Sequence, residues 1–191
     1  SDLWLMATVA GGIVLDNVVL FTFGKEPRAL PSSWANEAID VFGAGAYPLQ
    51  LVISVAGLGI ALLLTLVQGR TRLGKAMLAT VQQPEAARLM GINTRVVIAC
   101  AFALSTVFAG IAGLLIAPLF NVSASMGTIF GIKAFAAAIL GGISSAWGVV
   151  IAGVLYGCVE ALTTAYLGSS YTQIVSFSLV IVVLVTVPNG L

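Results

Sequence analysis

Four polar side chains lie inside stretches that are otherwise apolar: Asp16, Asn17, Lys133 and Glu160. Charged groups are rare inside a membrane, where they pair with one another or line a path for polar cargo. On helices rising 1.5 Å per residue, Lys133 and Glu160 lie roughly 16 and 24 Å from the turn at Ser144, and the lysine stem can span much of the difference. We therefore expect either an ion pair that fixes helix register or two groups that line a translocation path.

The first apolar stretch carries Asp16 and Asn17 near its outer end. Polar side chains on membrane helices commonly hydrogen-bond to a neighbouring helix, because lipid offers them no partner. The two residues are expected to supply polarity for helix packing or to extend the same translocation path.

The sequence does not contain the residue sets on which catalysis or metal binding usually depends. It has no histidine, which removes the commonest metal ligand and the commonest general base. Its two cysteines have no CxxC spacing, and they lie inside apolar runs. No nucleophile with a neighbouring base is visible, so we expect no catalytic residue, no metal site and no enzymatic activity.

Lipid is the predicted solvent for most of the chain. Of its 191 residues, 60% are hydrophobic and only 8% are charged, whereas a soluble domain carries about 25% charged residues. So few charges cannot cover a water-facing surface. The net charge of +1 also excludes the basic surface of a nucleic-acid-binding protein.

The predicted fold is an all-α integral membrane protein, a helical bundle of about six membrane segments. The apolar stretches are 3–23, 47–67, 95–120, 126–140, 146–167 and 172–187. The fourth would rise about 22 Å, less than the ~30 Å hydrocarbon core, so we expect it to be short or broken at Gly141 and Gly142. GxxxG patterns at 127–131 and 153–157 suggest close helix crossings, although this pattern is unspecific among 21 glycines.

A polar segment at 69–93 interrupts the apolar stretches, and a fifth basic residue follows it at once. The basic residues are Arg70, Arg72, Lys75, Arg88 and then Arg95. Short loops rich in lysine and arginine stay in the cytoplasm, so 69–93 is predicted to be cytoplasmic and 24–46 to lie outside. The later loops then alternate, unless 126–140 enters and leaves on the same side.

A short helix is predicted within this segment. Pro84 suits the first helical turn, Glu85 suits the positive helix start, and Gly91 suits a left-handed position just after the end. The helix would offer a small, partly apolar surface made by Ala86, Ala87, Leu89 and Met90. Such a surface suits either docking into a groove of a partner or lying on the lipid surface.

Residues 82–93, QQPEAARLMGIN, resemble the cytoplasmic coupling loop of ABC importer permeases, and more narrowly that of the branched-chain amino acid permease family. Three further stretches support this resemblance: 131–143 (GIKAFAAAILGGI), 157–162 (GCVEAL) and 171–191 with its final PNGL. The resemblance covers 69–191 well and the first 68 residues weakly. Asp16 departs from the family, which more often has Gln-Asn where this chain has Asp16-Asn17.

The resemblance implies a type II ABC importer permease fold, with Glu85, Ala86, Ala87 and Gly91 in the helix that couples to the ATPase. Family members form the membrane channel of an importer and work with two ATPase subunits, a second permease subunit and an extracytoplasmic substrate-binding protein. Family permeases have further helices at the N-terminal side, so residues 1–191 are expected to be a single permease domain from a longer chain. The expected location is the inner membrane.

The implied function is the import of branched-chain or other hydrophobic amino acids. No GxxxxGK[ST] loop is present, so we expect the chain to hold no cofactor and ATP to bind only to partner subunits. Sibling permeases carry urea, short amides or sugars, and these substrates stay open as alternatives. A secondary transporter or channel is the alternative from a different class, since broken helices and intramembrane charges suit it too.

Overall fold

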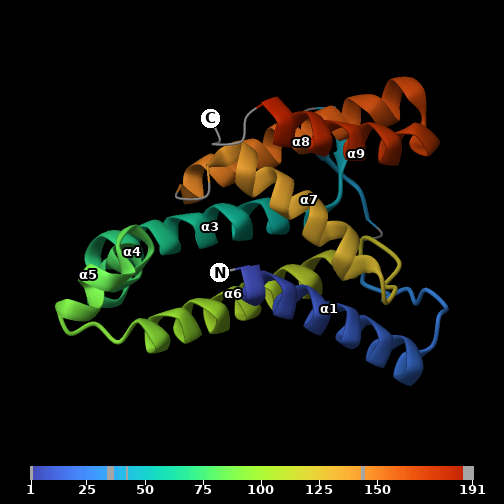
Figure 1. Ribbon diagram of the computed structural model, residues 1–191. Helices are drawn as coiled ribbons and strands as arrows, with labels where there is room; N and C mark the ends of the chain where they lie inside the picture. Colours follow the sequence, from blue (N-terminus) through green and yellow to red (C-terminus); the bar gives the residue numbers. More distant parts are fainter. Residues whose placement is uncertain (1, 34–36, 42, 143–144, 187–191) are drawn as a thin grey trace.

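The computed structural model describes residues 2–33, 37–41, 43–142 and 145–186 (Figure 1). The turn at Ser144 and the C-terminal PNGL sequence lie outside these residues. Within them, five helices are long and apolar enough to cross a membrane, and α7, Met126–Gly141, is a shorter apolar helix. The five are α1 (Asp2–Phe23), α3 (Pro48–Arg70), α6 (Thr94–Ile116), α8 (Ala146–Leu167) and α9 (Ser169–Thr186).

These six helices confirm the six predicted membrane segments, and the fourth is the short one as expected. With 16 residues, α7 rises about 24 Å. The predicted ends differ at three places. Helix α3 runs on to Arg70, α9 begins at Ser169 after a left-handed Gly168, and α6 ends at Ile116 rather than at 120. Pro118 follows closely, and proline cannot donate the backbone hydrogen bond that would continue the helix.

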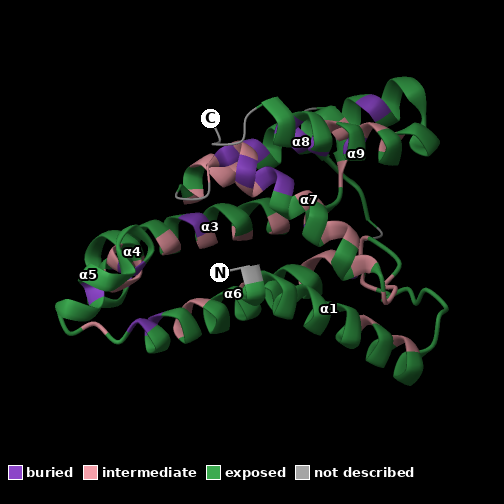
Figure 2. Ribbon diagram, viewed as in Figure 1, coloured by how far each residue is buried: buried purple, intermediate pink, exposed green. Residues whose placement is uncertain are grey.

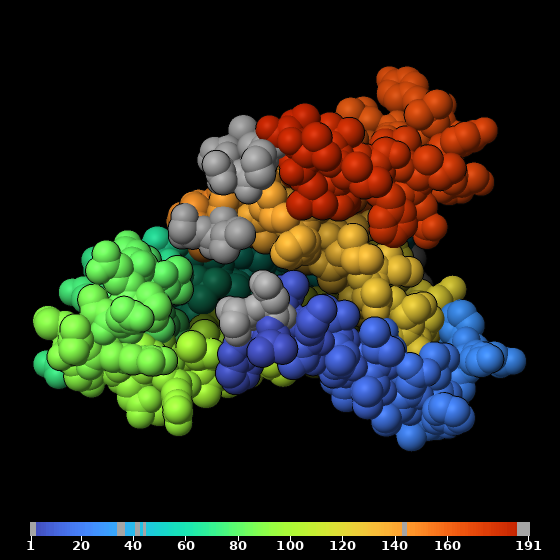
Figure 3. Space-filling model, viewed as in Figure 1, coloured from blue at the N-terminus to red at the C-terminus, as the bar shows by residue number. Residues whose placement is uncertain are grey.

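Three elements were not predicted from the sequence. The first is helix α4, Arg72–Gln82, which occupies most of what was expected to be loop. The helix that follows it, α5 (Pro84–Leu89), is the predicted short helix. A two-stranded antiparallel hairpin, β1 (Ile39–Val41) and β2 (Ala44–Ala46), lies in the segment before α3. In Figure 3, α4 and α5 form a green lobe that projects from the rest of the molecule. We call residues 72–92 the tip.

The end of the bundle remote from the tip is joined by backbone hydrogen bonds. The Arg28 N–H donates to the Val122 carbonyl at 2.9 Å, and the Val122 N–H donates back to Arg28 at 2.8 Å. This pairing connects the segment after α1 to the segment after α6. Figure 1 shows these two segments at the right of the view, with the tip at the left. These two segments belong to loops that were predicted to lie outside, and they are at the same end of the bundle.

The buried core lies among α7, α8 and α9. Ala136, Tyr156 and Val180, one from each helix, form a buried cluster, with Leu179 packed against it. Figure 2 shows most of the buried positions here, whereas α1 is almost wholly exposed. Exposed apolar surface is the expected state of helices that face lipid or other membrane helices.

The closest helix contact occurs where α7 ends and α8 begins. A Cβ atom added to Gly141 would collide with the backbone of Gly148 and Val149, and a Cβ added to Gly148 would collide with the Gly141 carbonyl. By contrast, a Cβ at any glycine of the two GxxxG patterns meets nothing within 4 Å. Close packing in the described residues therefore occurs at Gly141 and Gly148, not at the GxxxG patterns.

Replacing Gly148 by alanine should destabilise the folded protein by about 1–3 kcal/mol, because the two backbones must separate to admit a methyl group. Gly153→Ala on the same helix is the matched control. It fills open space and removes a helix-interior glycine, so stability should stay unchanged or rise by up to about 1 kcal/mol. Thermal unfolding of the purified protein in detergent measures both, and equal losses in the two variants would contradict the proposed contact.

Candidate functional site

The tip begins with a sharp corner between α3 and α4. The Thr71 hydroxyl donates to the Val67 carbonyl at 2.6 Å and accepts the Gly74 N–H at 3.0 Å, so one side chain closes α3 and caps α4. A Cβ at Gly74 would collide with the backbone at Val67 and Gln68. The corner thus depends on a capping threonine and on a glycine that lets the two helices touch.

Helix α5 ends in a Schellman motif. Gly91 has φ of +81°, its N–H donates to the Arg88 carbonyl at 3.0 Å, and the Ile92 N–H donates to the Ala87 carbonyl at 3.0 Å. This pair of bonds around a left-handed glycine satisfies carbonyls that a helix end otherwise leaves open. Pro84 occupies the first turn, so the local signals at both ends of the predicted helix coincide with its observed ends.

The exposed face of α5 differs in one residue from the face expected from sequence. Leu89 and Met90 are 89% and 83% exposed, and Pro84, Glu85 and Ala86 are exposed as well. Ala87 is buried at 4% exposure, so it packs inward and does not contribute to the surface. The reason is geometric, since a helix less than two turns long resting on α4 must turn one of its sides inward.

The tip is also joined to the next membrane helix. The Arg88 Nε donates to the buried Thr94 hydroxyl at 3.0 Å, and the Asn93 side chain caps α6 by accepting the Val96 N–H at 3.5 Å. Helix α5 is therefore connected to α6 by a side-chain bond as well as by the chain itself. On its other side, the tip is connected to α3 through the corner at Thr71.

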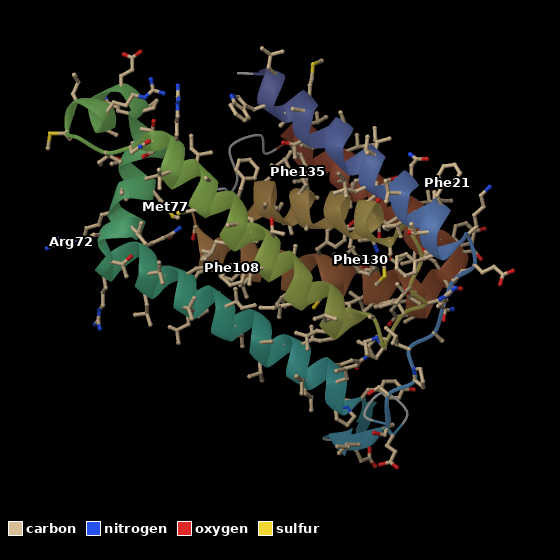
Figure 4. All side chains as sticks on the ribbon, turned by 90° about the horizontal axis from the view of Figure 1, so that it is seen from below. Phe21, Arg72, Met77, Phe108, Phe130 and Phe135 are labelled. Atoms are coloured by element: carbon tan, nitrogen blue, oxygen red, sulfur yellow. The ribbon has the colours of Figure 1, made fainter. Side chains whose placement is uncertain are left out.

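The second site is the polar cluster inside the bundle. Lys133 on α7 and Glu160 on α8 form an ion pair, with the Nζ atom 2.5 Å from Oε1 and side chains 20% and 28% exposed. The Lys133 ammonium also lies 5.8 Å from the centre of the ring of Phe130, a residue labelled in Figure 4. An aromatic face at this distance attracts a cation.

Two residues that were not singled out from sequence extend this cluster to α9. The Ser176 hydroxyl donates to Glu160 Oε1 at 3.3 Å, and the Tyr156 hydroxyl donates to the Ser176 carbonyl at 3.0 Å. Tyr156 lies one turn before Glu160 on the same helix face, and that spacing was the available signal. The polar cluster, Lys133, Glu160, Ser176 and Tyr156, thus joins three helices.

Asp16 and Asn17 are not part of this cluster. Thr128 on α7 donates to the Asp16 carboxylate at 2.7 Å, which joins α1 to α7. Asn17 donates to the Ile13 carbonyl of its own helix at 2.8 Å. Over the described ranges, no group of three or more histidine, cysteine or acidic residues comes together.

Comparison with known proteins gives relatives over almost the whole chain. This chain is 37% identical over 192 residues to the high-affinity branched-chain amino acid transport system permease protein LivH of Escherichia coli K12. The alignment covers 98% of this chain and 62% of LivH. The chain is 32% identical to the corresponding protein BraD of Pseudomonas aeruginosa, with the same coverage. The chain thus spans 62% of the length of these curated relatives.

A more distant relative is the galactose/methyl galactoside import permease protein MglC of Haemophilus influenzae. It is 28% identical over 173 residues, which cover 87% of this chain and 51% of MglC. No solved structure matches the chain. Residues 4–184 match the family described as branched-chain amino acid transport system / permease component. This match covers nearly all of a chain with five candidate membrane spans, and the protein is a multi-pass membrane protein that belongs to this permease family.

Proposed function

We propose that this chain is the permease subunit of an ABC importer in the inner membrane, and that it imports branched-chain or related hydrophobic amino acids. An extracytoplasmic binding protein delivers the substrate, a second permease subunit completes the channel, and two ATPase subunits supply the energy. The observation that carries the proposal is the tip, where a short helix leaves the side chains of Leu89 and Met90 exposed. Family membership supports it.

The mechanism follows from how the tip is fixed. Closure of the ATPase pair around ATP moves α5, which lies on the cytoplasmic side. Because Thr71 joins the tip to α3 and Arg88 joins it to Thr94 on α6, the movement reaches both helices and alternates access to the channel. The chain itself carries no phosphate-binding loop, so ATP belongs to the partners.

The polar cluster has a structural role in this proposal. Lys133, Glu160 and Ser176 hold α7, α8 and α9 in one register, so that these helices move as a unit. The second assignment, which places the ion pair in the translocation path, is tested by the same substitutions. A zwitterionic amino acid would need one partner group for its ammonium end and one for its carboxylate end, but a path must also release its cargo.

Leucine uptake should be inhibited by excess isoleucine or valine and unaffected by urea or galactose. The assay uses the full-length permease with its partner subunits, in cells that lack their own importer for these amino acids. Branched-chain side chains differ by single methyl groups, which a hydrophobic site distinguishes only weakly. Competition by galactose, the sugar named for MglC, would instead assign the chain to sugar import.

Leu89→Asp should lower import about tenfold or more, since a charge at the centre of an apolar docking surface typically costs more than 1.4 kcal/mol. Two further variants should have the same effect by disrupting α5. Gly91→Val places a valine in a strained left-handed conformation, and Ala87→Asp buries a charge. Transport and ATPase rates are measured together in proteoliposomes, where loss of coupling shows as ATP hydrolysis without import.

The matched control is Leu30→Asp, the same substitution at an exposed leucine outside the tip, in the segment that Arg28 joins to Val122. It should leave coupling unchanged. Coupled transport at the wild-type rate in the three tip variants would refute the role of α5.

Single charge reversals, Lys133→Glu or Glu160→Lys, should each lower the amount of folded permease and its transport rate about tenfold or more. Each places two like charges in contact inside the bundle, at a cost of several kcal/mol. The double reversal should restore much of both. Tyr156→Phe removes a single hydrogen bond from the cluster and should cost only about 1 kcal/mol.

Two outcomes separate the alternatives for the ion pair. If both single variants transport normally, the pair has neither role. If the double reversal restores folding but transport stays lost, the two charges act on the substrate rather than on helix register.

A further inference from the structure

A large cavity lies between the beginning of α1 and the first turns of α6. Its volume is about 820 Å³, within the range of pockets that hold small organic ligands. Its lining residues are Trp4, Arg88, Thr94, Arg95, Ile98, Ala99 and Phe102. The lining thus combines four apolar side chains with two arginines and one threonine.

A second, more polar cavity of about 370 Å³ adjoins the first. It is lined by Arg88, Ile92, Asn93, Thr94 and Arg95. Arg88, Thr94 and Arg95 belong to both linings, so the two arginines lie at the boundary between an apolar space and a polar one. A ligand with an anionic head and an apolar tail matches this division.

The two guanidinium groups have capacity for an anion. Arg88 uses its Nε atom to bond Thr94, which fixes the side chain and leaves its two terminal nitrogens available. Over residues 2–33, 37–41, 43–142 and 145–186, neither arginine forms a salt bridge with an acidic side chain. Paired N–H donors of this kind bind phosphate oxygens in bidentate fashion.

The position relative to the membrane favours a lipid over a soluble anion. Arg95 is the second residue of α6, and Phe102 lies about 10 Å further along the helix axis, in the direction of the hydrocarbon core. An arginine at a helix entrance, with an aromatic ring below it and Trp4 opposite, matches the headgroup and upper acyl levels of one leaflet. A soluble anion would leave the apolar lining unused.

We propose that Arg88 and Arg95 bind the phosphate of an anionic phospholipid, whose acyl chain lies along Trp4, Ile98 and Phe102. The site is separate from the docking surface at Leu89 and Met90. The proposal rests on the membrane embedding of α1 and α6 and not on the transported substrate. Lipid bound here would contact α5 through Arg88, and so would act on the same helix that the ATPase moves.

Tryptophan quenching tests the site directly. The full-length permease carries Trp34→Phe and Trp147→Phe, so that Trp4 is the only tryptophan of residues 1–191, and any tryptophan elsewhere in the protein is likewise replaced by phenylalanine. It is titrated in detergent with phosphatidylglycerol or phosphatidylcholine, each brominated on its acyl chains. Phosphatidylglycerol should quench Trp4 at no more than about one tenth of the concentration that phosphatidylcholine needs. The reason is that each arginine near the membrane surface contributes about 1 kcal/mol toward an anionic lipid.

The preference for phosphatidylglycerol should disappear in the double variant Arg88→Gln/Arg95→Gln. It should persist in Arg70→Gln/Arg72→Gln, which removes two charges at the corner between α3 and α4, outside the cavity. If the first double variant does not fold, Arg95→Gln alone is used, because it breaks no hydrogen bond of the described residues. This single variant should lose most of the preference.

Two outcomes overturn the proposal: equal quenching by the two lipids in the unsubstituted protein, or an equal loss of the preference in the Arg70/Arg72 variant. If inorganic phosphate binds to Arg88 and Arg95 while the two lipids quench Trp4 equally, the site takes a soluble anion and the proposal is overturned.

Discussion

The constraint on which this structure depends is that lipid gives membrane helices no hydrophobic reason to associate. Contacts between helices must come from close backbone packing and from polar groups that have no other partner. Both occur here in few places. Gly141 and Gly148 bring α7 against α8, the polar cluster joins these two helices to α9, and one bond from Thr128 to Asp16 joins α1 to α7.

Most hydroxyl groups along the helices do not contribute to such contacts. Thr65, Thr80 and Thr106, for example, donate to the carbonyl four residues earlier in their own helix. A hydroxyl that is hydrogen-bonded within its own helix has little free-energy penalty in lipid, and it does not attract a neighbouring helix. The specificity of the bundle therefore rests on the few polar groups that bond between helices, among them the carboxylates, the ammonium group and the Tyr156 hydroxyl.

Sequence was sufficient for features set by local chemistry. The apolar stretches are the helices, and Pro84 and Gly91 bound α5 because a proline start and a left-handed end are properties of single residues. Helix α4 was not predicted, because no proline start or left-handed glycine end marks it as these mark α5. Its own glycine, Gly74, serves a tertiary contact that no local pattern reveals. The inward direction of Ala87 likewise depends on where α5 rests on α4.

The polar cluster shows the same division. Two opposite charges in apolar helices made an ion pair a reasonable expectation, but Ser176 and the Tyr156 hydroxyl depend on the placement of α9. GxxxG patterns pointed to the wrong crossing, because they report small size and not which side of the helix meets a neighbour. The glycines that do make contact, Gly141 and Gly148, are seven residues apart in the sequence and follow no such pattern.

The joint between the segments around Arg28 and Val122 is made by main-chain atoms alone. Any residue except proline supplies the N–H and carbonyl groups that it needs. Side chains at this end of the bundle are consequently free to change in charge and size over evolutionary time while the two loops stay connected. An end of the bundle whose backbone is held in place while its side chains can vary is a surface on which permeases of one family can diverge to bind different proteins.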